Sequence, residues 1–201
     1  MILRIPNTEI LDLERVIISI GNEFSNKQAL ILSEDDLKCH LFTQLYNQYY
    51  CKSYWTMDNG ILGCPIHTEI RFYNAQDKLT FIPDITILNP ENLSIKKRIQ
   101  EYGLPSKQFE FGGDAVVFEL KFCKNKNGIS KYNIESYKKD IEKIKEIQSI
   151  NRNKGNKIFG FFVIFNKTAS YIPNFENFLR SEDYNSNQLK IIYASGNIVF
   201  R

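Results

Sequence analysis

The stretch DAVVFELKF, at residues 114–122, decides how this sequence folds. It is apolar on both faces near its start, which predicts a strand in the interior of a sheet. Because side chains alternate along a strand, Glu119 and Lys121 share one face near its end. Burying either charge alone is costly, so each needs a partner or an ion. One interpretation is an internal ion pair at the sheet edge, and the other is a functional site.

A helix and a second buried strand are expected to follow. Residues 132–149 have an apolar face at helical spacing, and residues 158–165, IFGFFVIF, are apolar on both faces. A strand–helix–strand unit over 114–165 should be parallel and right-handed. A short helix from Pro173 and a terminal strand or hairpin at 189–195 and 197–200 complete this half.

Upstream, the apolar spacing predicts a helix at 8–24 and a second one beginning at Ser33, a good N-cap. Residues 65–72 and 79–88 alternate with period two and predict a hairpin with its turn near 74–78. Residues 91–103 are expected to be a helical insertion and 104–113 a loop. The order of elements predicts an α/β fold with a mixed central sheet flanked by helices.

Asp84 stands out because it follows Pro83 inside the otherwise hydrophobic stretch FIPDITIL. Proline is tolerated at a strand edge or a bulge, so the backbone here is expected to be irregular. A bulge would aim the Asp84 carboxylate outward at the margin of the sheet. A simple turn aspartate is the alternative, but residues 85–88 continue the strand.

Together, Pro83–Asp84 and Glu119-Leu120-Lys121, 35 residues later (119 − 84), resemble the motif of the PD-(D/E)xK nuclease superfamily. The resemblance implies a restriction-endonuclease-like core (α-β-β-β-α-β) over residues 33–165. It implies one such domain over 1–201, with an N-terminal helical extension at about 1–30. The implied activity is that of a metal-dependent endonuclease, of restriction or repair type, that hydrolyses phosphodiester bonds in DNA. An RNA-directed nuclease and a non-catalytic nucleic-acid-binding module that retains the fold are the alternatives.

The resemblance also implies roles for the site residues. Asp84 and Glu119 would share a Mg²⁺ ion, with Mn²⁺ as a substitute, because Mg²⁺ prefers carboxylate oxygens and water. Lys121 would orient or deprotonate the attacking water, or stabilise the developing charge. Many members add a glutamate from the helix before the hairpin, and Glu34 is the candidate here. Asp35 and Asp36 are alternatives, and a first-turn acid that favours the helix dipole is the competing interpretation.

The distribution of charge indicates a polyanionic partner. Residues 124–157 hold ten Lys or Arg and four Asp or Glu, a charge of +6, whereas the whole chain carries +3. We expect phosphate contacts from four lysines and one histidine of this region and the hairpin: Lys124, Lys126, Lys138, Lys139 and His67. A solvated helix face is the alternative for the lysines, and a solvent-facing strand is the alternative for His67 and for Glu69, which could supplement the metal site.

Other classes of protein are disfavoured. The four cysteines show no CxxC spacing, so a zinc site is not expected. No segment approaches the ~20 apolar residues of a membrane span, and the N-terminus does not resemble a signal peptide. We therefore expect a cytoplasmic protein without a membrane partner. Cleavage of both strands of a duplex would favour a homodimer.

Overall fold

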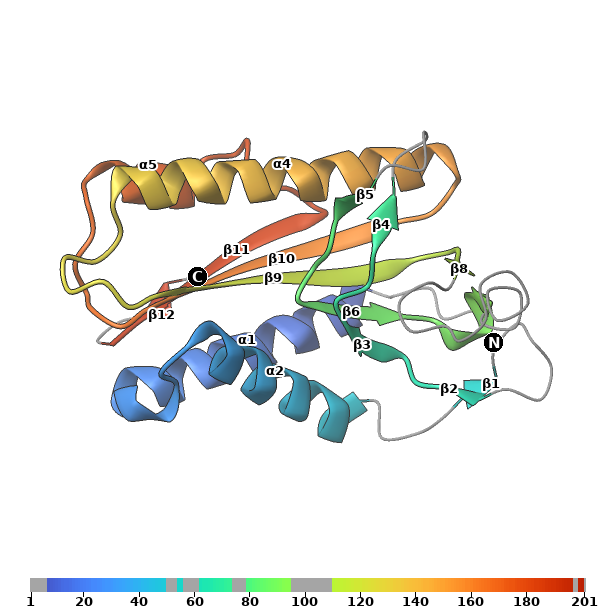
Figure 1. The fold of residues 1–201 in the computed structure, drawn as a ribbon, viewed down its shortest axis with the longest axis horizontal. Helices are drawn as coiled ribbons and strands as arrows, with labels where there is room; N and C mark the ends of the chain where they lie inside the picture. The colour runs from blue at the N-terminus through green and yellow to red at the C-terminus, as the bar shows by residue number, and fades with distance from the viewer. Residues whose placement is uncertain are drawn as a thin grey trace.

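The computed structural model describes residues 7–49, 54–55, 62–73, 79–94, 110–196 and 199–200. These residues form three layers, with helices on both faces of one sheet (Figure 1). Helices α1 (Asn7–Asn26) and α2 (Glu34–Tyr49) cover one face, and α4 (Lys131–Asn153) and α5 (Asn174–Arg180) cover the other. The predicted α/β class, with a mixed sheet flanked by helices, is confirmed. None of the helices within the described ranges has the length and apolarity that crossing a membrane requires.

The central sheet has six strands in the order β12-β11-β10-β9-β6-β3. Strands β9, β10 and β11 are parallel, and the other pairs are antiparallel. The predicted interior strand at 114–122 is β9, and the parallel strand–helix–strand unit is β9, α4 and β10. The bounds of the strands are β3 Ile66–Thr68, β6 Ile85–Leu88, β9 Ala115–Cys123, β10 Ile158–Asn166, β11 Leu189–Ser195 and β12 Val199–Phe200.

Two hydrophobic cores fix the faces of β9. Phe118 and Leu120 pack in the core that contains α1 and α2, and the Phe118 ring stacks on Phe161 with centroids 5.2 Å apart. Ala115 and Val117 pack in the other core, beneath α4 and α5. Glu119 and Lys121 continue the alternation of Ala115 and Val117, so they leave the strand on the α4 side.

The helices begin where the sequence predicts. The Ser33 hydroxyl accepts a hydrogen bond from the Asp36 N–H at 3.0 Å, which caps α2. Ser130 caps α4 in the same way, in a reciprocal arrangement with Asn133. The predicted helix at 8–24 is α1, and it packs against the sheet with residues such as Leu13 fully buried.

The predicted hairpin is present, but both of its strands are broken, so the prediction of two continuous strands was wrong. Residues 65–72 divide into β3 and β4 (Phe72–Tyr73), and residues 79–88 divide into β5 (Leu79–Phe81) and β6. Glu69 stands at the first break with a φ of 56°, a left-handed conformation that a regular strand does not allow. Pro83 stands at the second break. The breaks let β4 and β5 leave the sheet and rise beside α4 (Figure 1).

The segment between β6 and β9 also differs from the prediction. Where a helical insertion was expected, the described residues form a single 3-10 turn, η2 (Pro90–Asn92), followed by β7 (Leu93–Ser94). β7 pairs with β8 (Glu110–Phe111), where a loop was predicted. The rest of the predicted insertion and the turn at 74–78 lie outside the described residues. Three short elements remain: η1 (Gln28–Leu30), and β1 (Tyr54–Trp55) paired with β2 (Leu62–Gly63).

Candidate functional site

The site is built on the part of β9 that extends beyond its neighbour β6. Their last regular pair is Ile85 with Phe118, so no residue of β6 lies opposite the end of β9. Two carboxylates take the place of the missing strand. The Leu120 N–H donates to Asp84 Oδ2 at 2.8 Å, and the Phe122 N–H donates to Glu34 Oε2 at 3.1 Å. The residue before β6 and the first residue of α2 are thus both acids held against the same strand edge.

Glu119 and Lys121 form the second half of the site, on the α4 side. The Lys121 ammonium donates to Glu119 Oε1 at 2.6 Å and lies 2.9 Å from Asp140 Oδ2 on α4. The other oxygen of Asp140 pairs with Lys143 at 2.8 Å. The side chains of Glu119, Lys121 and Asp140 are at most 18% exposed, so these ion pairs are shielded from water.

Lys38 of α2 completes the site, and reasoning from the sequence missed it. Its ammonium lies 3.0 Å from Asp84 Oδ1 and 3.5 Å from Glu69 Oε1. Lys38 follows Glu34 by one helical turn, so both side chains leave α2 on the same side. That i,i+4 spacing was the available signal. Asp140 was also missed as a site residue, because only packing of α4 on β9 brings it to Lys121.

These side chains are called the acidic cluster below; it comprises Glu34, Glu69, Asp84, Glu119 and Asp140, with the lysines Lys38, Lys121 and Lys143. Five carboxylates against three ammonium groups leave a formal charge of −2. The structure therefore brings together Asp84, Glu119, Lys121 and Glu34, the four residues predicted for the site.

Burial sets the protonation of the cluster. It raises the pKa of Glu119 from 4.5 to about 7, against the opposing effect of Lys121, and the nearby charges of Asp84 and Asp140 add to the rise. Burial also raises the pKa of Glu34, whose carboxylate lies against the strand although the residue as a whole is exposed. Burial alone would lower the pKa of Lys121, but Glu119 and Asp140 more than offset it, and the net shift is upward.

In two further members, Asp140 and Lys38, ion pairs shift the pKa in the direction that favours the charged form. Burial would raise the pKa of Asp140, but hydrogen bonds from Lys143 and Lys121 outweigh it and lower the pKa. Burial would lower the pKa of Lys38, but its contacts with Asp84 and Glu69 outweigh it and raise the pKa. At neutral pH both lysines that touch Asp84 or Glu119 are therefore ammonium ions.

The donor set suits a hard divalent cation. Within the described residues, no three His, Cys, Asp or Glu side chains lie close enough to hold a metal ion as they stand. Their chemistry nevertheless fits Mg²⁺, which takes carboxylate oxygens, and so does the charge of −2. A further polar group is consistent with a bound cation. The buried Thr86 hydroxyl has no hydrogen-bond partner among the described residues. Thr86 pairs with Val117, one step from Glu119 on the same face of β9.

His67, a predicted phosphate contact, is half-buried on β3. Its Nε2 lies 2.6 Å from the carbonyl oxygen of Cys64. Burial lowers its pKa, so the ring is neutral at pH 7 and Nε2–H donates to that oxygen. Glu69, the other group predicted for this strand, belongs to the cluster through its contact with Lys38.

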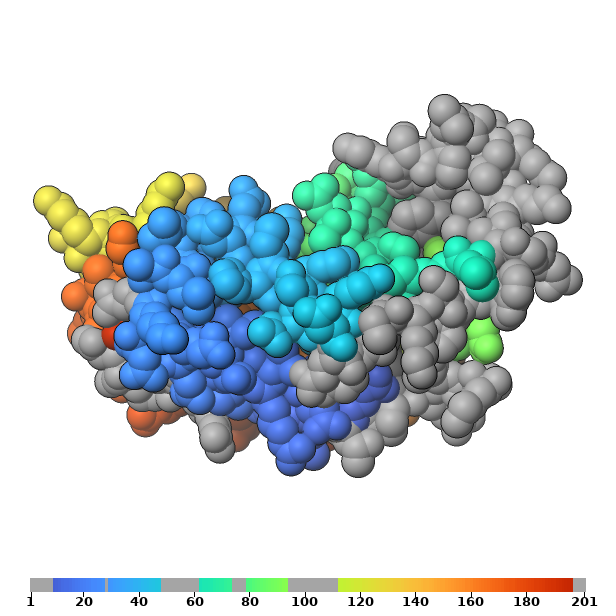
Figure 2. Space-filling model, turned by 90° about the horizontal axis from the view of Figure 1, so that it is seen from below, coloured from blue at the N-terminus to red at the C-terminus, as the bar shows by residue number. Residues whose placement is uncertain are grey.

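The four predicted phosphate-binding lysines fall into two groups. On α4, Lys138 pairs with Glu135 of its own helix at 3.0 Å, and Lys139 is exposed. Lys124 and Lys126 are exposed in the loop after β9, which projects from one end of the molecule in yellow (Figure 2). The turn after β10 lies beside this loop, since the Lys167 N–H donates to the Cys123 carbonyl at 2.9 Å. Lys167 thus adds a third exposed lysine at the end of β9 where Lys121 lies.

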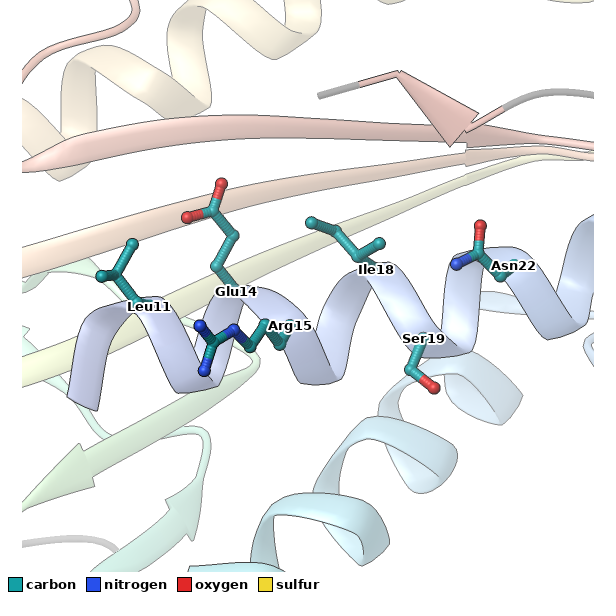
Figure 3. A pocket seen from close by; sticks show the side chains of 6 residues that line it. All are labelled: Leu11, Glu14, Arg15, Ile18, Ser19 and Asn22. Atoms are coloured by element: carbon teal, nitrogen blue, oxygen red, sulfur yellow. The ribbon is translucent and has the colours of Figure 1, made fainter. Parts of the chain in front are cut away.

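A hollow elsewhere on the surface shares no residue with the acidic cluster. It has a volume of about 360 Å³ and lies along α1 (Figure 3). Its lining consists of Leu11, Glu14, Arg15, Ile18, Ser19 and Asn22. Its lining includes only one acid, against five in the cluster, so the cluster is the better candidate for a catalytic site.

Comparison with known proteins adds no relative. No protein-family model matches the chain, and searches of curated proteins and of solved structures find no match. The residues of the acidic cluster and their arrangement are therefore the basis for inferring a function.

Proposed function

We propose that this chain is a metal-dependent nuclease of the PD-(D/E)xK type, acting on DNA as an endonuclease. One observation carries the proposal: Asp84 directly precedes β6 and accepts from the Leu120 N–H at 2.8 Å, beside Glu119 on β9, whose Oε1 lies 2.6 Å from the Lys121 ammonium. Two acids on neighbouring strands beside a lysine form the arrangement that the superfamily motif requires.

The order of elements around the site supports the proposal. When only the strands of the central sheet are counted with the helices, the order from α2 onward is α2, β3, β6, β9, α4 and β10, which is the α-β-β-β-α-β order implied by the resemblance. Asp84 directly precedes the second of these strands, Glu119 lies in the third, and Glu34 is in the first turn of the preceding helix. Short motifs occur by chance, but this one coincides with the order of elements that it predicts.

Asp84, Glu119 and Glu34 are the residues that would hold the metal. A Mg²⁺ ion bound there would offset charge on the scissile phosphate and increase the acidity of a nearby water. Asp84 and Glu34 are held by backbone N–H groups of β9, so the strand itself sets the position of both carboxylates. Preorganised ligands of this kind lose little entropy when a cation binds.

Lys121 is expected to act as a cation and hydrogen-bond donor. Its pKa is raised, so the group is an ammonium ion at neutral pH and does not serve as a base in this arrangement. Its N–H groups can orient a water or stabilise charge that develops on the phosphate oxygens. Of the roles implied by the motif, deprotonation of the water is therefore the one we set aside.

The basic end of the molecule suits a polyanionic substrate. Lys124, Lys126 and Lys167 are exposed and follow the strands that carry or adjoin the cluster. Lysine contacts with phosphates position a nucleic acid without reading its sequence. We infer that the backbone of the substrate passes this end on its way to the cluster.

The test is a substrate panel. Supercoiled plasmid, linear duplex, single-stranded DNA and RNA are each incubated with Mg²⁺, Mn²⁺ or EDTA. We expect cleavage of plasmid DNA with either metal and none in EDTA, with 5′-phosphate and 3′-hydroxyl ends. Cleavage of RNA alone would favour the RNA-directed nuclease, and binding without cleavage of any substrate would favour the non-catalytic module.

A further inference from the structure

We propose that Lys38 is an internal cation that orients Asp84 and must be displaced from it, toward Glu69, when a divalent cation binds. The inference rests on the proposed function, because it concerns the same site. It adds a positioning residue that the superfamily motif does not contain.

The contacts of Asp84 are the first observation. Both of its oxygens are engaged: Oδ2 accepts from the Leu120 N–H at 2.8 Å, and Oδ1 lies 3.0 Å from the Lys38 ammonium. The Leu120 N–H is fixed in β9, whereas lysine carries its charge on a flexible four-carbon chain. Lys38 is therefore the partner that can yield an oxygen of Asp84 to another cation.

The second observation is that another carboxylate, that of Glu69, lies within reach of Lys38. Glu69 Oε1 lies 3.5 Å from the same ammonium, and the Glu69 side chain is 64% exposed, against 15% for Asp84. A small movement of the lysine chain would exchange a buried carboxylate for a hydrated one. Glu69 also holds a left-handed φ of 56°, which turns the chain at the end of β3 beside Asp84.

Charge balance gives the inference its direction. With Lys38 in place the acidic cluster carries a formal charge of −2, and without it −3. Removing the positive charge next to Asp84 should strengthen the attraction of the cluster for a divalent cation, because the lysine and the metal repel each other. If Lys38 merely tied α2 to the hairpin, its removal would loosen Asp84 and weaken metal binding instead.

The experiment titrates Mn²⁺ into the full chain by calorimetry, without nucleic acid. Lys38→Met should tighten the Kd about tenfold relative to the wild type. Lys38→Arg keeps the charge and should stay within about twofold of wild type. Lys190→Met is the matched control, because Lys190 is a half-buried lysine paired with Glu14 between β11 and α1, outside the cluster. Its Kd should not change.

Glu69 supplies a second test of opposite sign. Glu69→Gln removes the receiving carboxylate and should weaken metal binding about threefold. In the Lys38→Met background, Glu69→Gln should not change metal binding, since there is no ammonium for the Glu69 carboxylate to receive. If Glu69 were instead a metal ligand, Glu69→Gln would weaken metal binding equally in both backgrounds.

The outcomes separate the two proposals. An unchanged or weaker Kd in Lys38→Met would overturn the inference, and Lys38→Gln takes its place if the methionine variant does not fold by circular dichroism. If Asp84→Asn abolishes binding while the Lys38 variants change nothing, the inference fails and the proposed function stands. If the wild type binds no Mn²⁺ or Mg²⁺, both are wrong.

Discussion

The Lys121 ammonium lies 2.6 Å from Oε1 of Glu119, two residues earlier on the same strand. Both side chains are largely buried, at 18% and 10% exposed, so each compensates a charge that would otherwise be costly. The internal ion pair, one of the two interpretations of the sequence, is therefore present, and it lies within the proposed site. Asp84, which directly precedes β6 and accepts from the Leu120 N–H, makes the pair part of a larger cluster.

Asp84→Ala should abolish metal-dependent cleavage while preserving or strengthening binding to DNA. The substitution removes a ligand of the proposed cation and also a negative charge close to the substrate phosphate. Cleavage assays and binding in EDTA measure the two effects. Asp114→Ala is the matched control, because Asp114 also accepts from a backbone N–H, that of Lys157 at 2.7 Å, but at the opposite end of β9. Cleavage at the wild-type rate by Asp84→Ala would disprove the proposed active site.

Lys121→Ala should lower the rate of cleavage by about 100-fold or more while metal binding persists. The ammonium is not a metal ligand, but it donates to Glu119 Oε1 at 2.6 Å. Rates under saturating metal and a Mn²⁺ titration separate these effects. Lys145→Ala serves as the control, since Lys145 pairs with Glu142 at 2.8 Å on the same helix and lies outside the cluster. Loss of metal binding together with cleavage would give Lys121 a structural role alone.

Without metal, the protein should lose stability as pH rises from about 5 to about 8. Burial raises the pKa of Glu119 from 4.5 in the unfolded chain to about 7 in the folded one. The folded state therefore binds this proton more tightly than the unfolded state does. The resulting contribution to the free energy of unfolding, on the order of 3 kcal/mol, is fully present below pH 4.5 and is lost as pH rises past 7. Urea unfolding in EDTA at several pH values measures it. Glu119→Gln should flatten the slope, and an unchanged slope would assign it to other groups.

The affinity for duplex DNA should depend on salt mainly through the lysines at the end of β9 and β10. Each phosphate contact contributes about 0.9 to the slope of log affinity against log salt. Replacing Lys124, Lys126 and Lys167 by alanine should reduce that slope by about 2 or more. Replacing Lys138 and Lys139 should reduce it by about 1 or less, because Glu135 already neutralises Lys138. The reverse ranking would move the binding surface to α4.

Gly128→Ala should destabilise the loop that carries Lys124 and Lys126 far more than Gly155→Ala destabilises its own turn. Both glycines have positive φ, 71° and 80°, so each alanine costs about 1–2 kcal/mol in backbone strain. Only at Gly128 would the new Cβ also meet a backbone atom, 1.6 Å from the Ser170 carbonyl oxygen. Denaturant unfolding of the two variants measures the difference. If both variants lose the same unfolding free energy, this loop accommodates the additional Cβ without cost.

The regular elements could be predicted because their signals are local. The helix cap at Ser33, the spacing of Leu37, Leu41 and Leu45, and the two-faced apolar strand at 114–122 are read within a single element. The broken hairpin was missed because alternation over 65–72 continues through Glu69. The left-handed φ there depends on β4 leaving the sheet, which the alternation of neighbours does not encode.

The sequence by itself determined that Glu119 and Lys121 share a face of a buried strand, and that Asp84 stands in an irregular one, since side-chain alternation and proline geometry act over a few residues. Only the tertiary structure decided which charges meet them. Lys38 reaches Asp84 because α2 packs on one face of the sheet, and Asp140 reaches Lys121 because α4 packs on the other. Burial by both layers raises the pKa of Glu119, because desolvation requires the whole fold to exclude water from that strand edge.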